Sequence, residues 1–550
     1  MKTTLKRWLT RHDAQYIALL AIVGCLLMAI CSYTSPVFYF DYSPDNNAFF
    51  TVGKAMMHGI VPYKDIFEQK GPYVYWLHGL AYLVSHRSFV LIFGMEILVL
   101  VAAMTLTYYL ARRLRLTELG SFVLSLVSPV LFLYHPYYDY GDTVEFFVIP
   151  LILSLIYLIV LIDQRGVVAV SPWWFAVQGG LVGIVFLSKY TLLGAWIAFY
   201  LVLGGALLIN RQWTVLRRLV LASGAGFLVT TVPWLLYFLA TKSLGAFINV
   251  YIVFNTHAYI ASSVSAFSKL IQSAILLSQF YLGDVLFFVL GLVGTLVIIF
   301  TDDIFRTTFA KGLYLLVFVV SDLLAVYGYQ TNTVYLYYQL AYFPFFVLPL
   351  IYFVGRVLKR LGLAAYDDPF IILTTMVLSA FLVLGVNDNV TDSRLFPNNS
   401  SVTERHTRKP QQPAQLVFGR LMRQKTPAHR AMTLLNYGSI DMGFYTSSGA
   451  VPTQYYFQNY NVPRSAAPEI LTSQVRSIRH QKTEWVVLNT PKNRTVRNWH
   501  GNGTGKISGG DMNPGTAKLA KTLYRHYRLT AKHTQYFENN HVTYWLFQRK

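Results

Sequence analysis

Residues 40–80 read FDYSPDNNAFFTVGKAMMHGIVPYKDIFEQKGPYVYWLHGL and form most of a long connection between two apolar segments, from Phe40 to Arg87. Apolar side chains fall near helical spacing twice in this connection, first from Phe49 to Met57 and again from Tyr73 to Val84. Turn residues separate the two runs. The pattern predicts two amphipathic helices that lie along a membrane surface.

The rest of the first two-thirds of the chain is strongly apolar. Only 13% of the 550 residues are charged, against about a quarter in a soluble protein. A membrane span needs about 20 mostly apolar residues, and this criterion predicts about eleven spans within residues 1–386. We expect them at Tyr16–Phe38, Ser88–Leu110, Leu119–Tyr134, Phe146–Ile162, Trp173–Leu187, Tyr190–Leu208, Leu219–Leu239, Tyr281–Phe300, Gly312–Tyr327, Val334–Phe353 and Phe370–Gly385. The predicted fold class is therefore an α-helical multi-pass membrane protein.

Basic residues lie between alternate spans, as the positive-inside rule requires. The predicted cytoplasmic segments contain Lys2, Lys6, Arg7, Arg11, Arg112, Arg113, Arg115, Arg165, Arg211, Arg217, Arg218, Arg306, Lys311, Arg356, Lys359 and Arg360. This distribution predicts a cytoplasmic N-terminus and an extracytoplasmic C-terminal tail. We expect the first span to remain uncleaved, although Ile22-Val23-Gly24-Cys25 resembles a lipoprotein cleavage box.

The tail begins with a polar linker over residues 387–412, and residues 413–550 alternate strand-like and helix-like runs. Strands are expected at Met432–Leu435, Trp485–Leu488 and Val542–Phe547, and helices at Ala414–Met422 and Ala467–Ile478. This pattern predicts a small α/β domain.

Most of the net charge of +21 lies in the tail, because residues 391–550 hold 23 Lys or Arg and 7 Asp or Glu. Such a surface suits anionic lipid headgroups or an anionic cell-envelope polymer such as a teichoic acid. A basic face that only keeps the domain soluble is the alternative interpretation. No nucleic-acid-binding motif is present, so nucleic acid is not an expected partner.

The first loop resembles that of the GT-C superfamily of membrane glycosyltransferases, above all its protein-mannosyltransferase and aminoarabinose-transferase branch. The matching pieces are an acidic residue soon after the first span (Asp45), an aromatic helix, the sequence Gly-x-x-Pro-Tyr-x-Asp at Gly59–Asp65, and a Lys-Gly-Pro turn at Lys70–Pro72. Two weaker matches follow. Gly141–Phe146 looks like the acidic second outer loop of the family, and Tyr337–Leu340 looks like its late element, with tyrosine where histidine is usual.

The resemblance implies an inverting transfer of a hexosyl or pentosyl group from a polyprenyl-phosphate donor to a cell-envelope acceptor at the outer membrane face. Asp45 then corresponds to the catalytic base, and Lys70 corresponds to the lysine that contacts the donor phosphate. Asp41 is the second candidate for the base. A purely local role is the alternative for Asp45, because Ser43-Pro44-Asp45 is also a good helix start.

Five further residues are candidates for the site. Lys189 lies between two short spans at the predicted outer face, where it either contacts the donor phosphate or extends to the interface. Tyr63 and Asp65 either order the first loop or contact the acceptor. Asp142 and Glu145 either bind the acceptor or a metal ion, or form a capping box at a helix start.

No cofactor is required by the sequence, since no His/Asp/Glu cluster has strong metal-ligand spacing. Some GT-C relatives use a divalent cation such as Mg²⁺ or Mn²⁺, and Asp142 and Glu145 are the candidate ligands for one. Two other functions remain open at this point: a flippase or transporter for lipid-linked sugars, and a non-catalytic scaffold for wall assembly. The absence of clear internal repeats is less typical of a transporter.

Overall fold

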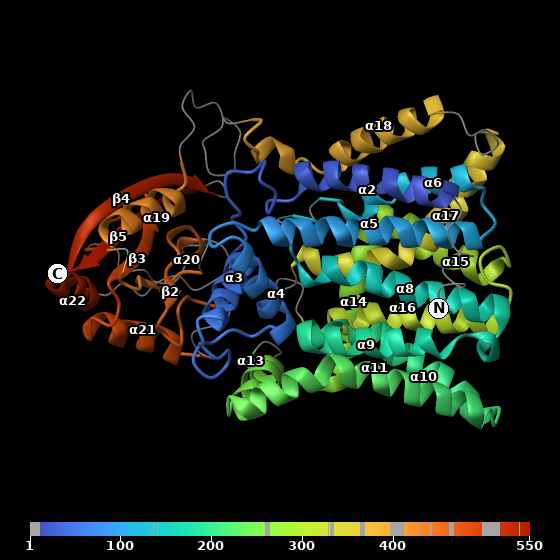
Figure 1. Cartoon of the computed structure of the whole chain (residues 1–550), viewed down its shortest axis with the longest axis horizontal. Coiled ribbons are helices and arrows are strands. Elements are labelled where there is room, and N and C mark those ends of the chain that lie inside the picture. The colour runs from blue at the N-terminus through green and yellow to red at the C-terminus, as the bar shows by residue number, and fades with distance from the viewer. Residues whose placement is uncertain are drawn as a thin grey trace. The chain divides into compact units, whose positions relative to one another are not determined.

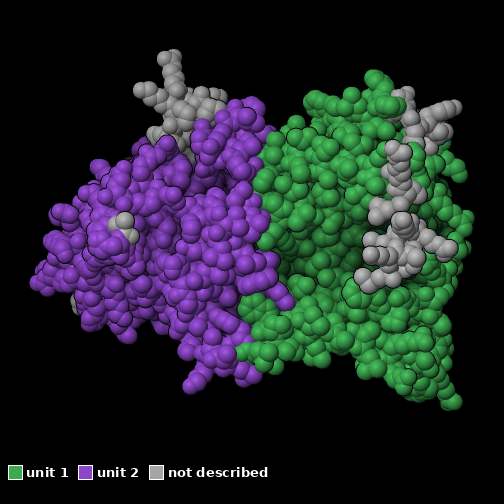
Figure 2. Space-filling view, in the orientation of Figure 1, with its two compact units in different colours: residues 1–32, 93–236, 263–388 green, residues 33–92, 237–262, 389–550 purple. Residues whose placement is uncertain are grey.

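The computed structural model describes residues 11–135, 137–139, 141–258, 265–327, 329, 335–362, 369–396, 412–427, 429–440, 443–460, 467–497, 517–537 and 540–550. They divide into two compact units (Figure 2). Unit 1 comprises residues 1–32, 93–236 and 263–388, and unit 2 comprises residues 33–92, 237–262 and 389–550.

Unit 1 is a bundle of apolar helices that lie side by side (Figure 1). Its elements are α2 (Arg11–Cys31), α5 (Val90–Arg113), α6 (Glu118–Val127), α7 (Pro129–Phe132), α8 (Val144–Arg165), η1 (Val167–Ala169), α9 (Pro172–Lys189), η2 (Tyr190–Leu193), α10 (Gly194–Ile209), α11 (Trp213–Ala240), α14 (Ala266–Gly283), η4 (Phe287–Val293), α15 (Gly294–Phe300), α16 (Thr308–Ala325), η5 (Leu336–Tyr342), α17 (Phe343–Arg360) and α18 (Pro369–Val386). The first residues of α5 and the last of α11 fall in unit 2.

The predicted multi-pass helical fold is confirmed. Among the described residues, eight helical stretches are long and apolar enough to cross a membrane, or nine if one bent pair counts as a span. The bent pair joins α14 to Phe287–Phe300 at 117°, so α14 occupies part of what the sequence predicted to be an outer loop. The predicted span Leu119–Tyr134 is divided at Pro129, which begins a new short helix because proline cannot continue the preceding hydrogen-bond ladder.

One of the eight stretches, Pro172–Ile209, is 38 residues long and contains the two spans that the sequence predicts there. The indole N–H of Trp196 donates to the side-chain oxygen of Gln178 at 2.8 Å. In a straight helix, residues 18 apart lie about 27 Å from each other, so the chain must reverse between them. The backbone at Lys189 is extended, with φ −154° and ψ 94°. The predicted boundary at Ser188-Lys189 is therefore where α9 ends and α10 turns back.

Unit 2 combines the first loop with the C-terminal domain. From the loop come α3 (Pro44–Met57) and α4 (Pro72–Val84), which pack against each other. The other helices are α12 (Leu244–Phe247), the π-helix η3 (Ile248–Phe254), α13 (Asn255–Ala258), η7 (Asn389–Asp392), α19 (Ala414–Lys425), α20 (Phe444–Ser448), α21 (Glu469–Arg479) and α22 (Ala517–His526).

The C-terminal domain is built on a five-stranded mixed sheet in the order β2-β1-β3-β5-β4. The strands are β1 (Thr433–Asn436), β2 (Val451–Pro452), β3 (Trp485–Pro491), β4 (Tyr527–Phe537) and β5 (Asn540–Arg549). β1 runs parallel to β2 and β3, whereas β5 runs antiparallel to β3 and β4. The predicted α/β class is confirmed. β4 was not predicted, because polar residues interrupt its apolar pattern at this edge of the sheet.

The helix α3 differs from an amphipathic surface helix. Its residues Asn46 to Ala55 are all buried, and its polar side chains face the C-terminal domain. The Lys54 ammonium donates to the backbone carbonyl of Tyr445 at 2.8 Å, and the Thr446 hydroxyl donates to Asn47 at 2.8 Å. The predicted apolar periodicity is thus present, but the C-terminal domain, rather than water, contacts the polar side of α3.

The two loop helices approach most closely at Gly53 and Gly79. A Cβ atom on Gly53 would lie 2.4 Å from the Gly79 nitrogen and 2.5 Å from the Tyr75 carbonyl oxygen. These are backbone atoms, which cannot move aside as a flexible side chain could. Glycine at position 53 is therefore required for the α3–α4 contact.

We expect Gly53→Ala to lower the free energy of unfolding by about 1 to 3 kcal/mol, because overpacking a close contact has costs of that order. Thermal unfolding of the purified protein in detergent measures this. Gly245→Ala is the matched control, since a Cβ there meets nothing within 4 Å and alanine favours helix. Equal midpoints for the two variants would show that the α3–α4 contact tolerates a Cβ.

Candidate functional site

The candidate site residues form two groups, one in each unit. The first lies on the loop between α3 and α4. Two tyrosines hold the peptide groups of Lys70: the Tyr63 hydroxyl donates to the Lys70 carbonyl at 2.7 Å, and the Lys70 N–H donates to the Tyr75 hydroxyl at 2.8 Å. The backbone of Lys70 is therefore fixed on both sides, which limits where its ammonium group can lie.

Tyr63 and Asp65 order this loop. Tyr63 is only 1% exposed and has a φ of 67°, a left-handed conformation that is costly for a bulky residue. Its burial and hydrogen bonds offset that cost. Asp65 is exposed, and its carboxylate accepts from the Val61 N–H at 2.9 Å. Two roles were predicted for Tyr63 and Asp65, ordering of the loop and contact with the acceptor. The hydrogen bonds described here are those of loop ordering.

Asp45 lies in the first turn of α3, one helical turn before Phe49. The Lys70 ammonium lies 6.0 Å from the centre of the Phe49 ring. Because residues i and i+4 share a helix face, the Lys70 ammonium lies over the face of α3 that carries Asp45. The predicted helix start is also present, since the Ser43 side chain accepts from the Asn46 N–H at 3.2 Å.

Asp41, the second candidate for the base, has a structural role. It is 2% exposed, and its two carboxylate oxygens accept from the Ser43 N–H and the Asn46 side chain, both at 2.8 Å. These bonds organise the turn into α3.

Glu68 belongs to the same group and was not predicted from the sequence. It is 6% exposed, and burial raises its pKa to about 7, partly offset by a hydrogen bond from the Gln69 N–H and by the charge of Lys70. The charge of Asp45 raises the pKa further. An acid two residues before Lys70 was visible in the sequence, but its burial was not, since this depends on tertiary packing.

The C-terminal domain encloses this loop. The Tyr460 hydroxyl donates to the Phe67 carbonyl at 2.7 Å, and the Phe67 N–H donates to the Tyr455 carbonyl at 2.8 Å. The Tyr455 hydroxyl in turn donates to the Tyr63 carbonyl at 3.1 Å. The soluble tail is therefore part of the structure that orders the loop carrying Lys70.

The second group lies in unit 1 and brings together three separate parts of the sequence. The Lys189 ammonium forms a buried ion pair with Glu145 at the start of α8. It also lies 3.6 Å from the centre of the Tyr338 ring and 5.7 Å from that of Tyr337. The acidic second loop, the junction between α9 and α10 and the late aromatic element thus meet at one end of the bundle.

Asp142 lies beside this group and is 3% exposed. Its N–H donates to the buried carboxylate of Glu96 at 2.6 Å, and this carboxylate also accepts from Ser32 and Tyr138. The predicted capping box between Asp142 and Glu145 is wrong. Thr143 caps α8 by accepting from the Phe146 N–H, and Glu145 is used by Lys189 instead.

A metal centre does not fit these residues. Among the described residues, no three His, Cys, Asp or Glu side chains form a group that could hold a metal ion. Glu145 already pairs with an ammonium group, which would repel a cation.

We expect Glu145→Gln and Lys189→Met each to destabilise the protein by about 3 to 5 kcal/mol, because each removes one partner of a buried ion pair. The double variant should recover a large part of that loss, since no charge is then buried without its counterpart. Thermal unfolding of all four proteins gives the coupling. Additive effects would contradict the pairing.

Glu68→Gln tests the buried carboxyl. A carboxyl whose pKa is higher in the folded than in the unfolded state destabilises the fold as pH rises from the unfolded value of 4.5 towards about 7. The variant should therefore unfold at nearly the same temperature as the parent at pH 5 and at a higher temperature at pH 8. Glu469→Gln, at an exposed position on α21, should show no such change. A pH-independent difference for Glu68→Gln would contradict the raised pKa.

The sequence matches no family model and no curated protein, but solved structures share its fold. The crystal structure of ArnT from Cupriavidus metallidurans bound to undecaprenyl phosphate superposes with a TM-score of 0.57 at 12% identity, covering 97% of both chains. The apo structure of the same protein gives 0.55 at 12% identity with the same coverage. The archaeal oligosaccharyltransferase AglB from Archaeoglobus fulgidus has 12% identity over 97% of this chain and 74% of its own. Its TM-score of 0.49 is too low to be used as evidence of a shared fold. The chain has the fold of the GT-C membrane glycosyltransferases.

Proposed function

We propose that this protein is a glycosyltransferase that moves a sugar from a polyprenyl-phosphate donor to a cell-envelope acceptor at the outer face of the membrane. The observation that carries the proposal is the placement of Lys70. Its ammonium lies over the face of α3 that carries Asp45, and its backbone is held by two tyrosine hydroxyls.

The transfer is an inverting substitution at the anomeric carbon. An acceptor hydroxyl oxygen forms a bond to that carbon while the bond to the donor phosphate oxygen breaks. The leaving phosphate keeps the electron pair, and Lys70 stabilises the negative charge that develops on it. Asp45 takes the proton of the acceptor hydroxyl. No oxidant or further reactant is needed for this step to balance.

Glu68 supports this assignment through its protonation. A carboxylate beside Lys70 competes with the donor phosphate for the ammonium, whereas a neutral carboxyl does not. Burial raises the pKa of Glu68 to about 7, so a large fraction of the molecules holds this group neutral near neutral pH. The charge of Lys70 is then more available to the donor.

For Lys189, the role of a phosphate contact stays a prediction from the sequence. Its ammonium is held by Glu145 and stacks on Tyr338, which positions it without exposing it fully to water. Asp142 remains a proposed acceptor contact. The Glu145 carboxylate orients Lys189 in this scheme rather than contacting the acceptor.

The structural neighbour supports the donor class, since the ArnT structure holds undecaprenyl phosphate. The proposed orientation follows from charge: basic residues collect at one end of the unit 1 helices, and the positive-inside rule makes that end cytoplasmic. The basic C-terminal domain then lies outside, where an anionic acceptor such as a teichoic acid is a suitable partner.

Asp45→Asn tests the enzymatic role. With purified protein and a panel of polyprenyl-phosphate sugars, release of the free lipid phosphate should fall at least 100-fold in kcat, while the KM for the donor changes little. Glu469→Gln, the same kind of change at an exposed position of α21, should leave transfer unchanged. Lys70→Met should lower kcat and should also raise the KM for the donor. Full transfer by Asp45→Asn would overturn the assignment of the base.

A further inference from the structure

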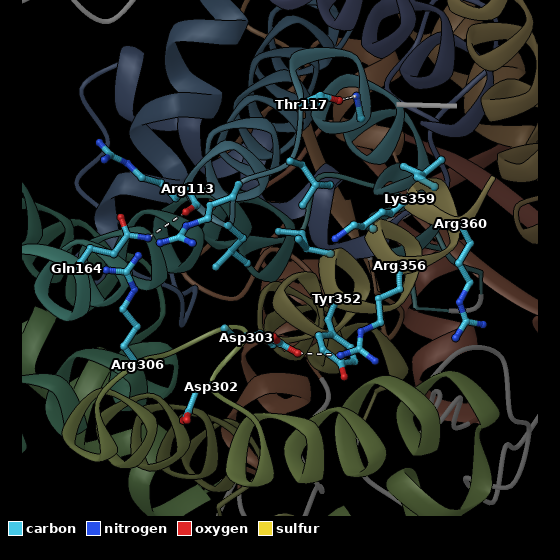
Figure 3. Close-up of a pocket in the computed structure, with 18 residues that line it drawn as sticks. Arg113, Thr117, Gln164, Asp302, Asp303, Arg306, Tyr352, Arg356, Lys359 and Arg360 are labelled. Carbon is cyan, nitrogen blue, oxygen red and sulfur yellow. Dashed lines mark hydrogen bonds and ion pairs between the residues drawn. The ribbon is translucent and has the colours of Figure 1, made fainter. Parts of the chain in front are cut away.

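A basic cavity lies at the end of the unit 1 bundle that carries the C-terminus of α8. Its volume is about 900 Å³, and its walls come from the α5–α6 turn, the end of α8, the segment before α16 and the last turns of α17 (Figure 3). Six Lys or Arg and two Asp residues line it: Arg113, Arg115, Arg306, Arg356, Lys359, Arg360, Asp302 and Asp303. The lining therefore carries an excess of four positive charges.

Local carboxylates do not neutralise this excess. Arg356 pairs with Asp303 at 2.9 Å, and Asp302 pairs with Lys311, which lies outside the lining. Among the described residues no ion pair involves Arg115, Arg306, Lys359 or Arg360. A cavity with several such cations is suited to an anion with more than one oxygen.

The walls of the cavity are held in place. The Asp163 carboxylate at the end of α8 accepts from the N–H groups of Arg306 and Thr307 at 3.0 and 2.9 Å. On the opposite wall, the Gln164 side chain donates to the Arg113 carbonyl at 3.0 Å. Arg115 has a φ of 66°, a conformation that such a residue keeps only when its surroundings fix it. The backbone segments that carry Arg113, Arg115 and Arg306 are thus held in place.

The depth of the cavity indicates the source of the anion. Gln164 lines the cavity, and Glu145 lies 19 residues earlier on the same helix, about 28 Å away at the rise of an α-helix. This is close to the thickness of the hydrocarbon core. The cavity therefore lies at the membrane surface opposite to the Glu145–Lys189 pair, at the depth of lipid phosphates. Leucine and isoleucine side chains also line it, as suits the start of an acyl chain.

We propose that this cavity binds the phosphate group of an anionic membrane lipid in the leaflet opposite to the Glu145–Lys189 pair. The guanidinium and ammonium groups of Arg306 and Lys359 contact the phosphate oxygens, and the apolar side chains contact the first part of the acyl chains. This site lies at the other end of α8 from the Glu145–Lys189 pair, and the proposal does not depend on the glycosyltransferase activity.

The test uses the full-length protein in detergent with phosphatidylglycerol as the probe and native mass spectrometry to measure binding. Arg306→Gln combined with Lys359→Gln should weaken retention of phosphatidylglycerol about tenfold or more, since each basic residue near an anionic lipid surface contributes about 1 kcal/mol. Arg217→Gln combined with Arg218→Gln removes the same charge from the exposed start of α11 but does not touch the cavity. This control should bind as the parent does.

Three outcomes would overturn the proposal. The first is equal loss for the two double variants, which would mean that total charge alone attracts the lipid. The second is equal retention of phosphatidylcholine, which has no net charge. The third is displacement of phosphatidylglycerol by millimolar inorganic phosphate alone, which would assign the cavity to a soluble anion. If Arg306→Gln/Lys359→Gln unfolds, Arg115→Gln/Arg360→Gln makes the same comparison.

Discussion

Hydrocarbon offers no partner for backbone N–H and C=O groups, so the chain crosses the membrane only where it can pair them internally as helix. The charged side chains of α8 accordingly lie at its two ends, Glu145 at one and Asp163 and Arg165 at the other. Helix α8 illustrates the consequence. Thr143 caps one end, the Glu145–Lys189 pair lies at that same end, and the other end reaches a basic cavity. The polar groups at both ends of α8 follow from that single restriction.

Two buried carboxyl groups of this protein compensate the free-energy cost of desolvation in different ways. Glu145 remains beside an ammonium group and forms an ion pair. Glu68 has Lys70 near it but also Asp45, and its burial is deep enough to raise its pKa to about 7. A charged group without adequate compensation neutralises itself instead. The first carboxylate thus keeps its charge beside a partner, whereas burial favours the neutral form of the second.

The first loop acquires its order from parts of the chain that lie far from it in sequence. Tyr455 and Tyr460 form hydrogen bonds with the backbone of Tyr63 and Phe67. The backbone carbonyl of Tyr445 accepts a hydrogen bond from the buried ammonium group of Lys54. A catalytic or binding loop needs such support if its side chains are to stay in place without substrate. The C-terminal domain supplies such support through these hydrogen bonds.

The sequence alone determined the features that depend on neighbouring residues. Hydropathy predicted most of the membrane helices, the helical spacing of apolar residues predicted α3 and α4, and short apolar runs predicted β1, β3 and β5. These predictions succeeded because spacing along one helix or strand is fixed by local geometry. The family resemblance singled out Asp45 and Lys70, and its place between two spans singled out Lys189; the roles of these three residues stay predictions.

Only the tertiary structure determined which distant residues come into contact. The chain reverses at Lys189, and this residue pairs with Glu145, which does not form a capping box. Helix α3 and Glu68 are buried, and Arg113, Arg306 and Lys359 line one cavity. Each of these features joins residues that lie far apart in the chain. Periodicity carries no information about such contacts, because they depend on how whole helices pack and on which side chains lose water when they do.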